Sequence, residues 1–86
     1  MVSNSLNFPC KFPIKIMTTP QKEVIKFILN TLKQWITKPK TIDFKNKRSK
    51  NGEYTSITVT FEALNKKQLD AIYYFLGKHQ KIYMVS

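Results

Sequence analysis

The side chains that most often catalyse reactions or bind metals are sparse in this chain and stand far apart. There is one cysteine, Cys10, and one histidine, His79, so no pair of these ligands exists at metal-binding spacing. The five acidic residues are Glu23, Asp43, Glu53, Glu62 and Asp70. No two of them are predicted to form a general acid and base, and the only glycines, Gly52 and Gly77, are too few for a phosphate-binding loop. We therefore predict a protein that is not an enzyme, holds no metal and uses no cofactor.

Positive charge is the one chemical feature that is concentrated, and it lies between residues 38 and 50. The segment contains six cationic side chains and one acidic side chain, so it supplies half of the net charge of +10. Within it, Lys45, Lys47, Arg48 and Lys50 form the candidate site for an anion or a partner. Such a field attracts phosphates, nucleic acid or acidic proteins. Lysines on an edge strand also discourage aggregation between sheets, and we favour this second interpretation.

Six elements must position these residues, in the order strand, helix, strand, strand, helix, strand. Alternation predicts strands at residues 12–18, 41–47, 54–63 and 81–85. Helical periodicity predicts helices at residues 20–37 and 65–77. The register of the last strand stays open, because each of residues 82–85 is apolar enough to be buried.

The ends of these elements carry their own signals. Thr19 is expected to cap the first helix, with Pro20 at its first position. Asn65 and Gln68 have the spacing of a capping box for the second helix. The Asn51-Gly52 pair predicts a hairpin turn in which Gly52 has a positive φ.

This order predicts an α+β fold, a ferredoxin-like βαββαβ sandwich. It has a four-stranded antiparallel sheet in the order 4-1-3-2 and two helices on one face. The expected core comprises Ile14, Ile16, Ile28, Leu32, Ile57, Val59, Phe61, Leu69, Ile72 and Leu76. Ile42 and Phe44 are also expected to face inward. We expect a single domain at residues 8–86 after a flexible N-terminus at residues 1–7.

The opposite face of the sheet is predicted to be open and mostly polar. It should present Lys15, Met17, Asp43, Lys45, Ser56, Thr58, Thr60 and Tyr83. This face lacks the aromatic platform on which RNA-binding sheets stack bases. No apolar run approaches the length of a membrane span, no signal peptide is recognisable, and a lone cysteine suits a reducing compartment. We expect a cytoplasmic protein with no membrane association.

Three segments of the chain, taken in order, form a recognisable pattern. They are FPCKFPIKIM at residues 8–17, SKNGEYTSITVT at residues 49–60, and QLDAIY at residues 68–73, which leads through Leu76 and His79 to Met84 and Val85. Together they resemble the YbeD-like family of small bacterial cytosolic proteins. The resemblance implies a fold similar to ACT-type regulatory domains and a regulatory role, for which a place near lipoate metabolism has been suggested. It supplies no catalytic residues.

The resemblance also implies a second candidate site. In ACT-like domains the turn between the first strand and the first helix can line an effector site, which here corresponds to Met17, Thr18 and Thr19. The chain differs from the family in having Thr18 where glycine is frequent and Ser86 where an apolar residue often ends the chain.

We therefore expect a small non-enzymatic regulatory or interaction domain of ACT-like architecture. It would bind a protein partner or a small metabolite, and a homodimer is compatible with its open sheet face. The alternative is a nonspecific nucleic-acid or phosphate binder that uses the basic segment at residues 38–50. The two hypotheses differ in salt dependence, since phosphate binding weakens steeply as salt rises.

Overall fold

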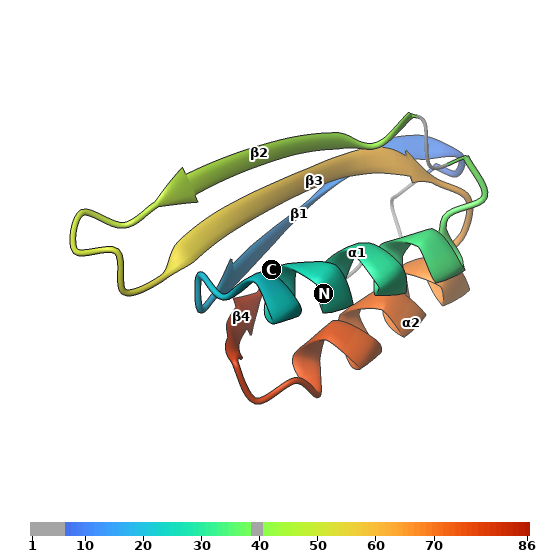
Figure 1. Ribbon diagram of the computed structural model, residues 1–86. Coiled ribbons are helices and arrows are strands. Elements are labelled where there is room, and N and C mark those ends of the chain that lie inside the picture. The colour runs from blue at the N-terminus through green and yellow to red at the C-terminus, as the bar shows by residue number, and fades with distance from the viewer. Residues whose placement is uncertain (1–6, 39–40) are drawn as a thin grey trace.

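The computed structural model describes residues 7–38 and 41–86 and has the predicted order of elements. The elements are β1 (Cys10–Thr18), α1 (Lys22–Trp35), β2 (Asp43–Arg48), β3 (Thr55–Ala63), α2 (Lys66–Gly77) and β4 (Ile82–Val85). The four strands form one sheet in the order β2-β3-β1-β4, and each pairing is antiparallel. Both helices lie on one side of this sheet (Figure 1). The predicted βαββαβ fold and its strand order are thus confirmed.

The two central strands, β1 and β3, follow the alternation in their sequences. They pair along their full length, from Cys10 opposite Ala63 to Thr18 opposite Thr55. Alternate residues of β3 are buried, so Val59 faces the helices and its neighbour Thr58 faces the other way. All ten residues of the predicted core are buried: Ile14, Ile16, Ile28, Leu32, Ile57, Val59, Phe61, Leu69, Ile72 and Leu76. They belong to one hydrophobic cluster.

The first helix is shorter than predicted at both ends. It begins at Lys22 after Gln21, so the expected Thr19 cap and Pro20 first position are wrong. The backbone N–H of Thr19 instead donates to the Lys81 carbonyl oxygen at 3.0 Å, which extends strand-like pairing up to the loop. At the other end α1 stops at Trp35, whose side chain is 36% exposed, so residues 36 and 37 lie outside the helix.

The start of α2 is the predicted one, but only half of the capping box forms. The Asn65 side chain accepts a hydrogen bond from the backbone N–H of Gln68 at 2.8 Å. The Gln68 side chain does not return to Asn65. Its Oε1 accepts from the Leu64 N–H at 2.7 Å, and its Nε2 donates to the Trp35 carbonyl oxygen at 2.7 Å. Gln68 is therefore a buried link between the end of α1 and the start of α2.

The edge strand β4 has a register that alternation could not supply. It pairs with β1 through a register shift between Met17 and Thr18, where Met84 lies opposite Met17 and Ile82 lies opposite Thr18. Only Ile82 of this strand is buried. Tyr83 was predicted for the open face; strand pairing instead places Met84 there, opposite Met17, while the Tyr83 side chain is 60% exposed. The other residues predicted for that face have the expected parity, as shown by the pairs Lys45 with Thr58 and Met17 with Ser56.

The other edge strand, β2, forms a long hairpin with β3 that extends past the helices (Figure 1). Gly52 in its turn has φ of 70°, as predicted. The strand covers Asp43–Arg48 rather than residues 41–47, and every one of its residues is exposed. Phe44 does point inward, since it pairs with the buried Val59. It is nevertheless 42% exposed, because the helix layer does not cover it.

Candidate functional site

The four predicted basic residues, Lys45, Lys47, Arg48 and Lys50, are all exposed. Strand pairing places Lys45 opposite Thr58 and Lys47 opposite Ser56, so both lysines stand on the open face of the sheet. Arg48 pairs with the buried Thr55 and has the opposite parity. The structure thus brings Lys45 and Lys47 together and places Arg48 and Lys50 around the end of the hairpin.

Two adjacent hollows at the hairpin share Lys47, Arg48, Ser49 and Tyr54, which we call the hairpin site. One hollow has a volume of about 480 Å³ and the other of about 240 Å³. Ser49 shapes the turn, because its N–H donates to the Tyr54 carbonyl oxygen at 2.9 Å while its Oγ accepts from the Tyr54 N–H at 3.2 Å. The hairpin site therefore offers cations, a hydroxyl and an aromatic ring at the end of the β2–β3 hairpin.

The predicted effector turn separates into two parts. Met17 lines the smaller hollow of the hairpin site, so it joins the basic residues. Thr18 is buried, and its Oγ1 donates to the Lys81 carbonyl oxygen at 2.9 Å. Thr19 is tied to the same carbonyl oxygen through its backbone N–H. The Lys81 carbonyl oxygen thus accepts from the Thr18 hydroxyl and the Thr19 N–H, while the Thr19 hydroxyl donates to Gln21 Oε1 at 3.3 Å.

An ion pair joins Lys81, whose carbonyl oxygen accepts from Thr18 and Thr19, to the first turn of α1. Lys81 Nζ lies 2.7 Å from Glu23 Oε1 near the start of α1. This hydrogen bond and the positive charge of Lys81 lower the pKa of the Glu23 carboxyl group below its ordinary value. His79 contacts the same residues, since its Nδ1 accepts from the Lys81 N–H at 3.1 Å and its ring lies 4.7 Å from that of Phe27. These contacts connect the loop before β4 to the first turn of α1.

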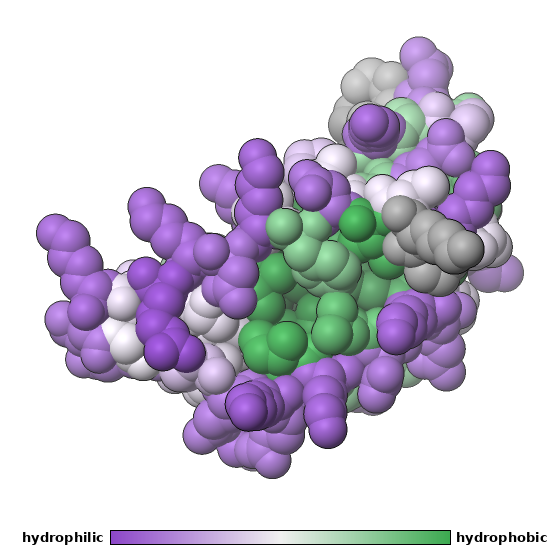
Figure 2. Space-filling model, turned by 45° about the horizontal axis from the view of Figure 1, so that its top comes forward, coloured by the Kyte–Doolittle hydropathy of each residue, from purple (hydrophilic) through white to green (hydrophobic). Residues whose placement is uncertain are grey.

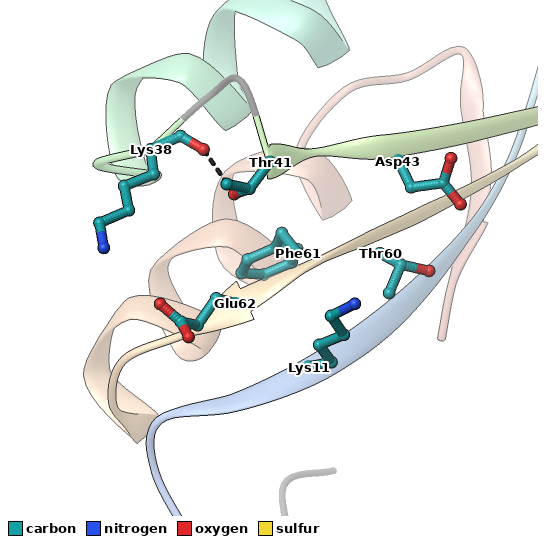
Figure 3. A pocket seen from close by; sticks show the side chains of 7 residues that line it. All are labelled: Lys11, Lys38, Thr41, Asp43, Thr60, Phe61 and Glu62. Carbon is teal, nitrogen blue, oxygen red and sulfur yellow. Dashed lines mark hydrogen bonds between the residues drawn. The ribbon is translucent and has the colours of Figure 1, made fainter.

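A third hollow, of about 470 Å³, lies at the other end of the sheet (Figure 3). Its charged side chains are of both signs: Lys11 and Lys38 are cationic, and Asp43 and Glu62 are anionic. Thr41 Oγ1 donates to the Lys38 carbonyl oxygen at 2.7 Å and fixes the rim. Among the residues that the structure describes, no three histidine, cysteine, aspartate or glutamate side chains gather to hold a metal ion. The mixed charges favour neither a simple anion nor a simple cation.

A largely apolar hollow is one that the sequence did not predict. It lies between α1 and β2, measures about 460 Å³, and is lined by Ile25, Ile28, Leu29, Lys33, Phe44, Asn46 and Ile57. We call this the α1–β2 groove. Ile28 and Ile57 are buried at its base, while Ile25 and Leu29 on α1 and Phe44 on β2 stand at its sides. Figure 2 shows apolar residues gathered in a hollow that hydrophilic side chains surround.

Helical and strand parity contained part of the signal for this groove. The apolar stripe of α1 includes Ile25 and Leu29, and alternation turns Phe44 inward. Both patterns predict burial. The two patterns do not give the distance between α1 and β2. In the structure these elements lie far enough apart to leave Ile25, Leu29 and Phe44 partly exposed.

Comparisons with known proteins place the chain in a family. Residues 3–86 match DUF493, which is described as a protein of unknown function. A UPF0250 protein of Paraburkholderia phytofirmans is 36% identical over 85 residues, covering 98% of this chain and 96% of the relative. A UPF0250 protein of Nitrosomonas europaea is 32% identical over 80 residues, covering 93% of this chain and 92% of the relative.

A solved structure supports the same assignment of fold. The solution structure of HP0495 from H. pylori matches with a TM-score of 0.70 at 21% identity, covering 100% of this chain and 94% of that one. Within the described residues, no helix is long and apolar enough to cross a membrane. The chain belongs to the DUF493 (UPF0250) family, and the resemblance to YbeD-like proteins is confirmed.

Proposed function

We propose that this member of the DUF493 family is a non-enzymatic regulatory domain that acts by binding a protein partner through the α1–β2 groove. The observation that carries the proposal is the exposure of Phe44 above an apolar base made by Ile28 and Ile57. Apolar surface that is left open and rimmed by polar side chains is typical of interaction sites. Large aromatic side chains at such sites often supply much of the binding energy.

The groove favours a protein over a small metabolite. It is open along one side, and Lys33 and Asn46 are the polar residues in its lining. A small-molecule site usually surrounds most of its ligand and fixes it with several convergent polar groups. An open apolar trough instead suits a side chain or two from a larger partner.

Site-specific photo-cross-linking tests the proposal. A photoreactive phenylalanine analogue at position 44 should capture a discrete protein in cells that express the full chain. The same analogue at Tyr74, which is 59% exposed on α2, serves as the matched control. Capture at position 44 that is absent at position 74 supports the proposal. Identical capture at both positions, or none at position 44, contradicts it.

The hairpin site favours a second candidate function, the binding of nucleic acid or phosphate. Lys47 and Arg48 lie with Tyr54 around the two hollows, which combines charge with one ring for stacking. A single ring is a small platform, and Lys45 stands outside both hollows. The affinity for single-stranded and duplex nucleic-acid probes, measured at several salt concentrations, should decide between the two candidate functions, because binding through phosphates weakens steeply as salt rises.

A further inference from the structure

We propose that the partner segment is an amphipathic helix with an apolar stripe and acidic flanks, which lies in the α1–β2 groove. This inference rests on the proposed function and names the chemistry of the partner. Three properties of the groove support it: its length along α1, the lysines beside it, and the charge of the whole molecule.

The length of the groove fits about two turns of a helix. Its α1 wall runs from Ile25 to Lys33, which corresponds to about 12 Å at 1.5 Å per residue. A docked helix presents apolar side chains at positions i, i+3 or i+4, and i+7, over a similar distance. Phe44 and Leu29 stand on opposite sides of the groove and would hold those side chains between them.

A stripe of lysines lies on the exposed face of α1, next to the groove. Lys22, Lys26 and Lys33 are separated by four and seven residues, so they share one face of α1 with Leu29. All three are exposed. The ion pairs formed within the described residues join Lys66 to Asp70 and Lys81 to Glu23, so they do not neutralise this stripe.

The neighbouring acidic side chain does not offset the lysine stripe. Glu23 lies on the same first turn of α1, but its carboxylate forms an ion pair with Lys81, just before β4. A partner with glutamate or aspartate beside its apolar stripe would therefore meet charges of opposite sign. Acidic flanks also speed the encounter with a basic protein.

Charge disfavours a second copy of this chain as the occupant. Each copy carries +10, and docking one groove on another would bring the two lysine stripes together. Like charges set opposite one another cost affinity and suppress that pairing. A partner with acidic side chains would avoid this repulsion and would be attracted to the lysines.

Fluorescence anisotropy with designed peptides tests the inference. The probe is a labelled peptide of about four helical turns, with leucines at i, i+3, i+4 and i+7 and glutamates on both sides of the stripe. One comparison peptide has glutamine in place of each glutamate. A second has the composition of the probe in scrambled order, which breaks the stripe.

Protein variants locate the binding. The double variant Lys26→Glu, Lys33→Glu reverses two charges of the stripe. The control, Lys47→Glu, Lys50→Glu, changes the net charge equally at the hairpin. The variant Phe44→Gln removes the aromatic wall, and circular dichroism checks that each variant is folded. If Phe44→Gln does not fold, the two double variants still carry the test, because all four lysines are exposed.

The expected result is that the native protein binds the acidic probe at least about tenfold more tightly than either comparison peptide. The double variant in α1 should lose about tenfold in affinity, whereas the hairpin control should stay within about twofold. Equal binding of the scrambled peptide, equal binding of the glutamine peptide, or an equal loss in the hairpin control would each overturn the inference. Self-association in sedimentation experiments that Phe44→Gln abolishes would also overturn it, in favour of a second copy.

This outcome can be separated from failure of the proposed function. Capture of a protein at position 44 without preference for the acidic probe keeps the proposed function and rejects the acidic helix. Preference for the probe without capture at position 44 keeps the chemistry of the groove and rejects the proposed cellular role.

Discussion

Gln68 joins the ends of the two helices through both polar atoms of its side-chain amide. Its Oε1 accepts from the Leu64 N–H and its Nε2 donates to the Trp35 carbonyl oxygen, each at 2.7 Å. Gln68→Leu should destabilise the fold by about 1–3 kcal/mol, because two backbone groups lose their partners. Urea denaturation measures this cost. Lys67→Leu, at the exposed neighbouring position, should change stability by less than about 0.5 kcal/mol. An equal effect of the two substitutions would show that the link contributes nothing.

The ion pair between Glu23 and Lys81 predicts a pH-dependent contribution to stability. The pKa of Glu23 in the folded protein lies below its ordinary value of 4.5, first because of the hydrogen bond from Lys81. A lowered pKa means that the contribution is present above 4.5 and disappears as the pH falls through the lowered value. The pair is exposed, so its contribution should be small and weaken with salt.

Glu23→Gln tests this sign. At low salt, the variant should be slightly less stable than the native protein near neutral pH, and the difference should vanish well below pH 4.5. Glu53→Gln, which removes an acid outside this ion pair, is the control. Urea midpoints measured across this pH range give the answer, and a difference that grows on acidification would contradict the assignment.

At the level of elements, the strands with clear alternation were predictable and the elements at the edges were less so. Alternation gave the inward face of β3 because Ile57, Val59 and Phe61 bury one side of a central strand. The start of α1 was predicted wrongly, because Thr19 and Pro20 carry a local helix signal that the long-range hydrogen bond to Lys81 overrides. Local sequence contains no information about such a partner.

The two glycines allow the same substitution to be compared in two elements. Gly52 has φ of +70°, whereas Gly77 ends α2 without a positive φ. Beyond the neighbouring backbone, a methyl group added at either position meets no heavy atom within 4 Å, so the substitution mainly changes backbone preference. Gly52→Ala should destabilise by about 1–2 kcal/mol, since alanine resists the left-handed region. Gly77→Ala should stabilise by up to about 1 kcal/mol. Thermal denaturation should therefore shift in opposite directions, and shifts of the same sign would contradict the backbone assignment.

At the level of the whole molecule, the α1–β2 groove depends on a relation between elements rather than on any one of them. Parity correctly turned Phe44 toward the helices, yet the hairpin carries β2 away from α1 and leaves the side chain 42% exposed. The candidate basic residues were predictable because charge and exposure follow directly from composition. That Met17 lines the same hollow as Lys47 and Arg48 could not be predicted, because it depends on the pairing of β1 with β3.

The charge of the whole molecule gives the last prediction. Replacing Lys45, Lys47, Arg48 and Lys50 by glutamine lowers the net charge from +10 to +6. A control of equal charge replaces Lys22, Lys26, Lys67 and Lys78, which lie on or next to the helices. If the basic segment protects the edge strand β2, the first variant should aggregate more readily than the control, because the backbone of an exposed edge pairs with other chains. Light scattering at matched concentration measures this difference.

The alternative, in which the segment binds nucleic acid, gives a different result with the same two variants. The slope of log affinity against log salt should then flatten by about 0.7–0.9 for each phosphate that the hairpin variant no longer neutralises, for any base sequence. We expect the aggregation result, since the two lysines on β2 line the strand that has no neighbour beyond it in the sheet. Salt-sensitive binding that the hairpin variant loses and the control keeps would instead assign the segment to nucleic acid.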